Sequence, residues 1–266
     1  MYHKESDFEL KDLNYIENEE KYAFTTLMAQ RMNIISIDKL SEFTYVKNVD
    51  LSYNRIESLD SIGSLNFLEN LDLSNNFLKS LPEICFQSLS KLVLNKNTIE
   101  HCEELKMPNL KQLYMNYNKL TQLKTKSGLP FLSYLPKLQV LSLSNNQTHS
   151  IHKDELNLPN LKALFIGFNS LKNLDSDVFS NLTSLRVLHL RKNRIKSLSF
   201  LEQEVSRNLQ YLNMRENEVE SLDRIDCPES LVHIVLMDNP VSNDKSYRDE
   251  ISSLNPGVRR IDKKNV

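Results

Sequence analysis

The chain has 266 residues, of which 40% are hydrophobic and 26% are charged, and its formal net charge is −2. This balance excludes a disordered chain, and it provides no overall positive field that would attract nucleic acid or an anionic membrane. Leu occupies 44 positions and Asn 29, whereas Gly occurs four times, so the composition disfavours a glycine-rich nucleotide-binding fold and is unusual for an ordinary globular domain.

One pattern, Leu-x-x-Leu-x-Leu-x-x-Asn-x-Leu, organises the chain between residues 46 and 241. It occurs nine times, with Ile, Val or Met in place of some leucines. Its asparagines are Asn54, Asn76, Asn97, Asn118, Asn146, Asn169, Asn193, Asn217 and Asn239. The intervals between them are 22, 21, 21, 28, 23, 24, 24 and 22 residues. This is the period of a leucine-rich repeat, and nine copies exclude a chance match.

The first predicted element is an N-terminal cap. Residues 7–23 place Leu13 and Ile16 at helical spacing among acidic residues, which predicts a short helix over the exposed end of the array. Residues 24–34 follow the repeat pattern poorly, with Met32 at the position of the asparagine. We interpret them as a degenerate first repeat.

The nine repeats predict an α/β solenoid, a leucine-rich repeat horseshoe with about ten short parallel strands and capped ends. The two leucines of Leu-x-Leu point to one side of a strand, and the residues that flank them point to the other. A single repeat cannot bury its own leucines, so the repeats fold as coupled neighbours. The Asn side chain has a donor and an acceptor, and we expect the asparagines to form a buried ladder that bonds the backbone. We expect one domain over residues 1–266, with a cap and degenerate repeat (1–45), nine repeats (46–241) and a C-terminal cap (242–266).

The longest interval contains an insertion around residues 124–134. This segment includes Gly128-Leu129-Pro130, which is typical of a turn. A solvated convex loop is the simpler interpretation, and a second contact surface is the alternative.

A helical cap is predicted after the last repeat. Asp244 is expected to begin the helix and Pro256 to end it. One face of this helix carries Tyr247, Ile251 and Leu254. Val258 and Ile261 then repeat the Leu-x-x-Leu spacing, which predicts a closing edge of the kind that an open solenoid end needs.

The N-terminus and the cysteines favour a cytoplasmic, reducing location. Residues 1–7 are polar, unlike the apolar core of a signal peptide, and no stretch approaches the ~18 apolar residues of a membrane span. Cys85, Cys102 and Cys227 lie far apart, without the paired spacing expected near the ends of a secreted repeat protein. We therefore expect free thiols and no membrane partner.

Enzyme motifs are missing from the sequence. It contains no Gly-x-Gly-x-x-Gly, no Gly-x-x-x-x-Gly-Lys and no Gly-x-Ser-x-Gly. His149, His152 and Asp154 resemble a set of metal ligands, but a solvated returning segment is the commoner explanation for such residues. We expect no catalytic residues, no metal, no cofactor and no small-molecule substrate.

The inner, concave side of the sheet is the expected place for a protein partner. The residues between the second and third leucines change along the array from acidic (Asp50, Asp72) through aromatic to polar. Aromatic residues and Arg are enriched in binding hot spots. The candidate partner-binding residues are Tyr114, Tyr117, Phe165, Phe168, His189, Arg191, Tyr211 and Arg215. Two alternatives remain: the aromatic residues merely stack along the sheet, or the partner binds the convex side or the termini.

The C-terminal repeats and cap carry a resemblance to a known family. It rests on Leu185-Arg-Val-Leu-His-Leu-Arg-Lys-Asn193, on residues 208–217 and 237–241, and on the cap segments 246–250 and 259–263. This run resembles the leucine-rich repeat-containing protein 23 family, whose members are components of axonemal radial spokes. The N-terminal residues 21–24 and 49–52 are similar to the opening of that family as well.

The resemblance implies a non-enzymatic scaffold of motile cilia and sperm flagella that binds other radial spoke proteins. It also implies a cytoskeletal location in the axoneme. A cytosolic or nuclear regulatory adaptor of the phosphatase-binding leucine-rich repeat type is the alternative, because a similar cap occurs in such proteins. Their uniform 22-residue units differ from the intervals of 23, 24 and 28 residues found here.

Overall fold

The structure, a computed structural model, describes residues 9–60, 62, 65–201, 207–222, 225 and 227–266. The chain forms two compact units. Unit 1 comprises Met1–Lys119 and Lys124–Lys137, and unit 2 comprises Leu120–Leu123 and Leu138–Val266. The single domain expected over residues 1–266 stays a prediction.

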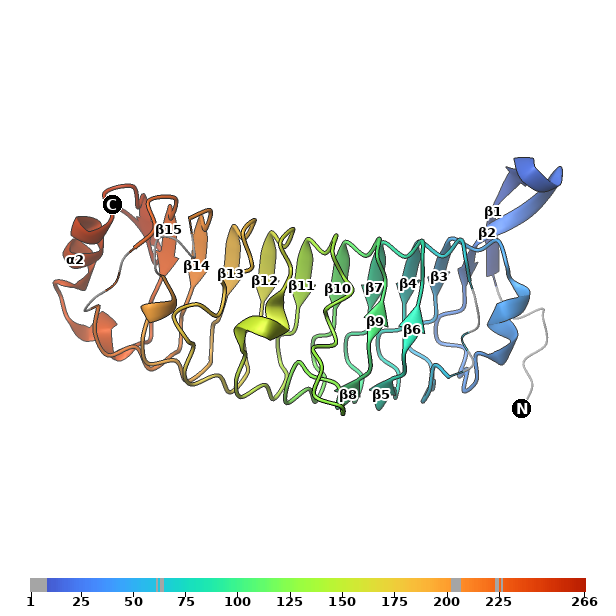
Figure 1. Ribbon diagram of the computed structural model, residues 1–266, viewed down its shortest axis with the longest axis horizontal. Helices are drawn as coiled ribbons and strands as arrows, with labels where there is room; N and C mark the ends of the chain where they lie inside the picture. The colour runs from blue at the N-terminus through green and yellow to red at the C-terminus, as the bar shows by residue number, and fades with distance from the viewer. Residues whose placement is uncertain (1–8, 61, 63–64, 202–206, 223–224, 226) are drawn as a thin grey trace. The chain divides into compact units, whose positions relative to one another are not determined.

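Unit 1 is a stack of short strands joined by extended segments (Figure 1). Its main sheet contains the parallel strands β2 (Lys21–Met28), β3 (Asn48–Asp50), β4 (Asn70–Asp72), β7 (Lys91–Val93) and β10 (Gln112–Tyr114). β1 (Glu9–Ile16) pairs antiparallel with β2. The returning segments form two small parallel pairs, β5 (Ser80–Leu81) with β8 (His101–Cys102) and β6 (Ile84–Cys85) with β9 (Leu105–Lys106). Two 3-10 helices, η2 (Glu17–Glu19) and η3 (Asp38–Glu42), lie near the N-terminus.

Unit 2 repeats the same arrangement. Its parallel strands are β11 (Val140–Ser142), β12 (Ala163–Phe165), β13 (Val187–His189), β14 (Tyr211–Asn213), β15 (His233–Val235) and β16 (Arg260–Ile261). β17 (Lys264–Asn265) closes the edge antiparallel to β16. The helices are η4 (Lys153–Leu156), η5 (Ser199–Leu201), η6 (Pro240–Asn243) and α2 (Tyr247–Leu254). None of the helices in the described residues has the length and apolar character needed to cross a membrane. Each unit is therefore a β-solenoid of stacked parallel strands, as the repeat pattern predicts.

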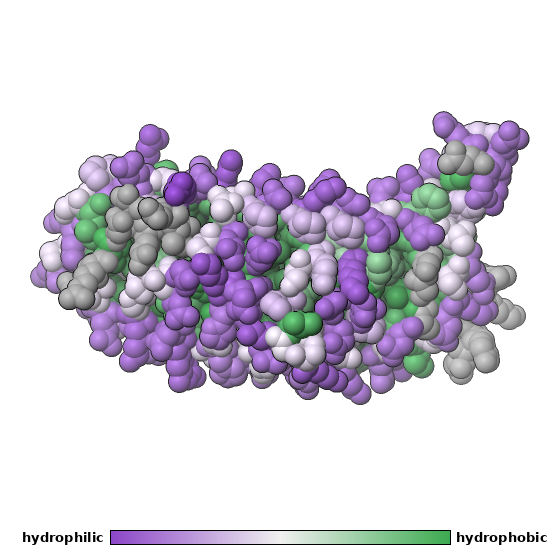
Figure 2. All heavy atoms as spheres, viewed as in Figure 1, coloured by the Kyte–Doolittle hydropathy of each residue, from purple (hydrophilic) through white to green (hydrophobic). Residues whose placement is uncertain are grey.

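The leucines of the pattern form the core. In the β12 repeat, Leu161, Leu164, Ile166 and Leu171 are fully buried, and each such side chain contributes about 1.5–3 kcal/mol through removal from water. Phe165 follows Leu164 in the strand and lies half-buried on the other side of the sheet. Hydrophilic residues cover most of the face drawn in Figure 2, as expected for side chains that alternate with a buried row.

The asparagines of the pattern turn their side chains to the backbone where each strand ends. Asn193 is representative: its Nδ2 donates to the carbonyl oxygens of Ile166 (3.1 Å) and Leu190 (2.9 Å), and its Oδ1 accepts from the N–H of Leu171 (3.1 Å). Eight of the nine asparagines are buried, whereas Asn169 is half-buried and makes equivalent bonds. Within each unit, such an asparagine thus ties its own repeat to the preceding one.

The residue before each asparagine has a left-handed backbone. These nine residues have φ between 55° and 62°, and none is a glycine. They are Tyr53, Asn75, Lys96, Tyr117, Asn145, Phe168, Lys192, Glu216 and Asp238. This conformation costs roughly 1–2 kcal/mol for a residue with a side chain. Hydrogen bonds between repeats offset that cost, since the N–H of Tyr53 donates to Ser74 (2.9 Å) and that of Lys96 to Asn116 (2.8 Å).

The predicted N-terminal helix is wrong. Its described part, from residue 9, forms the hairpin of β1 and β2, which extends beyond the edge of the repeats (Figure 1). Leu13 pairs across the hairpin with Phe24, and Tyr15 with Tyr22. The helical spacing of Leu13 and Ile16 was misleading because the alternating residues of this segment pair with the strand-forming aromatic residues of β2. Leu13 is 57% exposed, so it does not form part of a buried helical face.

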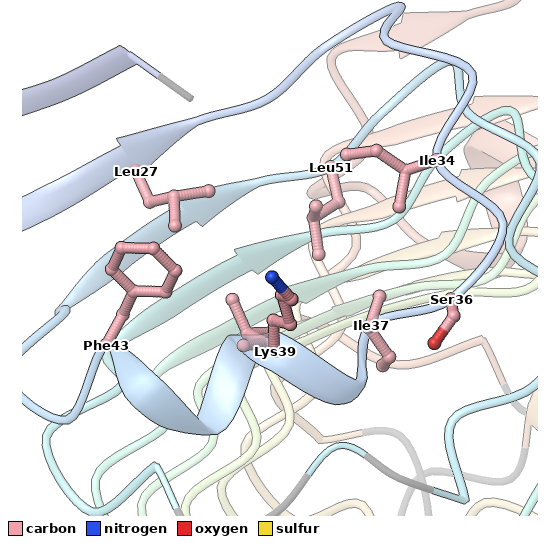
Figure 3. Close-up of a pocket in the computed structure, with 8 residues that line it drawn as sticks. Leu27, Ile34, Ser36, Ile37, Lys39, Phe43 and Leu51 are labelled. Carbon is pink, nitrogen blue, oxygen red and sulfur yellow. The ribbon is translucent and has the colours of Figure 1, made fainter. Parts of the chain in front are cut away.

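The degenerate first repeat follows the hairpin. Leu27 and Ile34 lie in the core, and the N–H of Ile34 donates to Oδ1 of Asn54 (3.1 Å). A cavity of about 30 Å³ remains between these residues and η3. Figure 3 shows Ile37, Lys39 and Phe43 around it, opposite the strand side chains. Its apolar lining and small size indicate loose packing of an imperfect repeat rather than a ligand site.

The insertion is partly loop and partly core. Thr125 accepts from the N–H of Gly128 (3.0 Å) and donates its own N–H to Leu129 (2.7 Å), which closes a tight turn with Gly128 at φ 85°. Phe131 and Leu132 are fully buried. The prediction of a solvated loop therefore holds for the turn and fails for these two residues, which supply apolar volume to unit 1.

The C-terminal helix has the expected place but a different start. α2 begins after Ser246, and Oδ1 of Asp244 accepts from the N–H of Ser246 (2.8 Å) in the turn that precedes the helix. Tyr247 and Ile251 are buried, whereas Leu254 is 40% exposed. Asp244 therefore orders the approach to the helix, and the predicted buried face ends one turn earlier than expected.

Candidate partner-binding surface

The solvent side of the sheet in unit 2 carries a row of four neighbouring rings, in which Phe165 stacks on His189 and Tyr211 meets His233 edge-on. Phe165 lies opposite His189 in the strand register, and Tyr211 lies opposite His233. The ring centroids are 4.9 Å apart between Phe165 and His189, 4.9 Å between His189 and Tyr211, and 4.8 Å between Tyr211 and His233. The first two residues end their strands and the last two begin theirs, so the row crosses the sheet diagonally. We call these four residues the ring row.

The four rings of the ring row are half-buried. Burial lowers the pKa of His189 below its ordinary value of 6.5, so this imidazole is neutral at pH 7. Nε2 of His233 lies 3.0 Å from the backbone carbonyl oxygen of Asp262. Because a carbonyl only accepts, Nε2 carries the hydrogen of this bond. Rings of this kind present apolar faces with polar edges, the combination that is enriched at protein interfaces.

Ion pairs hold the charged residues that follow the strands. Nε of Arg191 donates to Oε1 of Glu216 (3.0 Å), and Nε of Arg215 donates to Oδ2 of Asp238 (2.7 Å). The guanidinium of Arg191 also lies 5.3 Å from the ring centroid of Phe168, within the range of a cation–π contact. Side chains held in this way lose less conformational entropy when a partner binds.

The predicted partner-binding residues belong to two different units. Unit 2 contains Phe165, Phe168, His189, Arg191, Tyr211 and Arg215. Unit 1 contains Tyr114 and Tyr117. Tyr114 is half-buried on β10 with Nζ of Lys91 6.0 Å from its ring centroid, and Tyr117 is 54% exposed with Nζ of Lys96 at the same distance. The two tyrosines thus belong to unit 1 and not to the ring row, and each has a lysine as its neighbour.

Sequence reasoning missed His233, Glu216 and Asp238. His233 occupies the first position of its strand, as Tyr211 does, so a comparison of first-position residues would have found it. Glu216 and Asp238 each precede an asparagine of the ladder and have a left-handed backbone conformation. No periodic signal marks an acid there, and their pairing with arginines from the preceding repeats appears only in three dimensions.

The histidines and cysteines considered as metal ligands or disulfide partners in the sequence form neither kind of site among the described residues. The N–H of His152 donates to Oε2 of Glu155 (2.7 Å) at the start of η4, and Nδ1 of His152 lies 3.9 Å from Oδ2 of Asp175. Within the described ranges, the structure contains no group of three His, Cys, Asp or Glu residues that could hold a metal ion. The three cysteines form no disulfide, and Cys85 is exposed whereas Cys102 and Cys227 are buried.

Several segments of the chain match known protein families. A family described as Leucine rich repeat matches residues 136–195, and a related one matches residues 67–92. A family described as Leucine Rich repeats (2 copies) matches residues 183–227. The chain contains leucine-rich repeats. The matched segments contain three of the four ring-row residues, so the candidate surface is built on the repeats themselves.

The chain has relatives among receptors. It is 39% identical over 85 residues to Toll-like receptor 2 of Ovis aries and to that of Capra hircus. The match covers 32% of the chain and 10% of each receptor. The protein therefore spans about a tenth of the length of the curated relatives it matches.

Solved structures show the same fold at low identity. The leucine-rich repeat domain of APL1B has a TM-score of 0.64 at 22% identity, covering 82% of this chain and 58% of that one. The functional domain of InlJ from Listeria monocytogenes has a TM-score of 0.64 at 17% identity, covering 90% and 53%. The mouse RP105/MD-1 complex has a TM-score of 0.67 at 22% identity, covering 84% and 39%. These likenesses show a shared leucine-rich repeat fold.

Proposed function

We propose that the protein is a non-enzymatic scaffold that binds another protein through the solvent side of the sheet in unit 2. The ring row carries this proposal, because four rings with neighbouring centroids 4.8–4.9 Å apart form a continuous surface bordered by arginines held in ion pairs. Aromatic residues and Arg dominate binding hot spots. A leucine-rich repeat structure with the same fold, RP105, was solved as a complex with MD-1, and this supports the same use of the fold here.

Loss of the ring row is expected to remove the partner without unfolding the protein. Phe165→Ala combined with Tyr211→Ala removes two rings that are half-buried rather than in the core. Truncation of a true hot spot weakens binding by about 2 kcal/mol or more. The measurement is recovery of a partner with the tagged protein from cell extract, alongside thermal melts of both forms.

A matched variant separates this effect from a general loss of exposed rings. Tyr134→Ala in unit 1 removes a ring that is 49% exposed and outside the ring row, and it is expected to retain the partner. Because Tyr114 belongs to unit 1, Tyr114→Ala is tested separately. Retention of every partner by the variant of Phe165 and Tyr211 would place the interface on another surface.

The biological setting that we propose for this scaffold is the radial spoke of motile cilia and sperm flagella. Its support is the resemblance of residues 185–263 to the leucine-rich repeat-containing protein 23 family. The partners are then other radial spoke proteins, and the location is the axoneme. The tagged protein is expected to lie along cilia and to stay with the axoneme after detergent extraction.

Expression of the gene is the sharper test of this setting. Radial spoke scaffolds are needed in cells that build motile cilia, and loss of the protein is expected to impair beating while the organelle still assembles. If expression is confined mainly to cells without motile cilia, the radial spoke proposal fails. The cytosolic or nuclear adaptor of the phosphatase-binding type then becomes the better explanation, while the scaffold proposal itself is unaffected.

A further inference from the structure

A second surface, which lies in unit 1, is formed where the chain leaves each strand. It is formed by the residues with a left-handed backbone that precede the asparagine position of each repeat, and by the residues that directly follow that position. We call six of these residues the cation–aromatic rim, and they are Arg31, Tyr53, Arg55, Phe77, Lys96 and Tyr117. All six are exposed. The backbone of each repeat fixes them in a regular array, since the N–H of Arg31 donates to Ser52 (3.2 Å) as that of Tyr53 does to Ser74 (2.9 Å).

Two cation–ring pairs lie in the rim. The guanidinium of Arg31 lies 4.6 Å from the ring centroid of Tyr53, and Nζ of Lys96 lies 6.0 Å from that of Tyr117. Tyr53, Arg55, Phe77 and Lys96 line one depression of about 400 Å³, together with side-chain amides such as that of Asn75. The rim is therefore a hollowed surface that offers positive charge, aromatic faces and amide groups.

The rim cations have no carboxylate partners among the residues that the structure describes. Arg31, Arg55 and Lys96 form no ion pair there, and no acidic residue lines the depression. Two other lysines of these repeats are paired: Nζ of Lys79 lies 3.8 Å from Glu57, and Nζ of Lys119 lies 3.4 Å from Glu100. The charges of these two lysines are thus balanced within the unit, whereas those of the rim are left for a ligand.

We propose that the cation–aromatic rim binds an acidic, aromatic-containing segment of a partner protein. A guanidinium that lies against a ring keeps the N–H groups of its edge available, and these match a carboxylate in a fork geometry. The exposed rings of Phe77 and Tyr53 supply apolar contact for aromatic or aliphatic side chains between the acids. The rim belongs to unit 1 and shares no residue with the ring row of unit 2. The inference can therefore be tested independently of the proposed function.

Charge on the same unit favours a peptide over a nucleic acid. Asp50 and Asp72 lie on the adjacent strands β3 and β4, on the solvent side of the sheet. A nucleic acid carries a negative charge at every nucleotide and would be repelled by these carboxylates, since Asp50 lies only three residues before Tyr53 of the rim. A peptide can place its acids on the rim and neutral or basic residues beside Asp50 and Asp72. Single-stranded nucleic acid is therefore the competing ligand in the test.

The test is fluorescence anisotropy with short labelled peptides and the full chain. The probes are an alternating Glu-Tyr peptide, an alternating Glu-Ser peptide, an alternating Lys-Tyr peptide and a single-stranded oligothymidylate of equal length. The Glu-Tyr peptide is expected to bind most tightly, and its affinity is expected to fall at higher salt. Arg55→Glu combined with Lys96→Glu should weaken that binding by about thirtyfold or more, the loss typical of hot-spot residues.

The matched control is Lys79→Glu combined with Lys119→Glu, which makes the same change in net charge on exposed, paired lysines of unit 1. It should change the affinity by less than about threefold. Tyr53→Asn removes one ring while Asn tolerates the left-handed backbone, so it tests the aromatic part even if the charge-reversed variant does not fold. Absence of binding by the Glu-Tyr peptide, equal losses in the rim and control variants, or tighter binding of the oligothymidylate would each overturn the proposal.

Discussion

The hydroxyl of Tyr247 at the start of α2 donates a hydrogen bond to Oδ2 of Asp262, which lies fifteen residues further along the chain. The same carboxylate accepts from Arg248 (3.1 Å), and its Oδ1 accepts from the N–H groups of Leu236 (2.9 Å) and Met237 (3.0 Å). Asp262 is 97% buried, since its exposed fraction is 3%. One carboxylate thus joins the capping helix to the last repeat.

Tyr247→Phe is expected to destabilise the protein by about 1–3 kcal/mol. The substitution keeps the ring in its buried place but removes one donor to a buried carboxylate, and hydrogen bonds to charged groups fall in this range. Urea unfolding at pH 7, followed by circular dichroism, measures the change. A Tyr134→Phe variant, which removes the hydroxyl of a ring that is 49% exposed in unit 1, serves as the control. An unchanged midpoint for Tyr247→Phe would mean that Arg248 and the backbone satisfy Asp262 without it.

The same contact predicts a loss of stability in alkali. Burial, followed by the hydrogen bond to Asp262, raises the pKa of Tyr247 to about 12 from its ordinary value of 10.0. The unfolded chain therefore releases this proton first, and the contribution of Tyr247 is complete below pH 10 and lost as the pH rises from 10 to 12. Comparison of urea midpoints over this window should show a shallower decline for Tyr247→Phe than for the parent. Equal slopes would contradict the role given to this hydroxyl.

Some features of this molecule follow from sequence and others need the folded chain. The leucines could be placed because their spacing in the strands fixes which side they face. The hairpin at Leu13 could not, since a short segment with few apolar residues fits a helix and a strand equally well until its partner strand is known. The role of Asp262 was not predicted, because this residue follows the last repeat and no periodic pattern marks its position. The ring row was found in part: Phe165 and His189 share a strand position, whereas His233 lies opposite Tyr211, and that pair joins the row through the diagonal contact of Tyr211 with His189.

Removal of a ladder asparagine should destabilise unit 2 by an amount that depends on burial. Asn193→Ala leaves the N–H of Leu171 and the carbonyl of Ile166 without their partner in the interior, for an expected loss of roughly 1–3 kcal/mol. Asn169→Ala should lie near the lower end, because Asn169 is half-buried and water can replace its bonds. Denaturant midpoints of both variants measure the order. If both match the parent, the ladder does not stabilise the repeats.

The cysteines should differ in reactivity according to their burial. Cys85 is exposed, whereas Cys102 is buried and its pKa is raised by desolvation, which disfavours the reactive thiolate. A thiol reagent added to the native protein without reductant is expected to label Cys85 rapidly and Cys102 and Cys227 only after unfolding. Cys85→Ser should abolish the fast phase. Fewer than three thiols in the unfolded protein would reveal a disulfide and contradict the free state of these residues.

The ring row should make the stability of unit 2 depend on pH through His189. Burial lowers the pKa of His189 in the folded state, so the folded chain favours the neutral imidazole while the unfolded chain takes up a proton near pH 6.5. The stabilising contribution is therefore present above pH 6.5 and is lost as the pH falls through the lowered folded value. His189→Phe keeps a ring between Phe165 and Tyr211 but removes the titration, so its urea midpoint should fall less than that of the parent between pH 7 and pH 5. His101→Phe, at a residue of unit 1 on β8, is the matched control and should keep the slope of the parent. If the variants of His189 and His101 decline alike, burial of His189 does not control the response to acid.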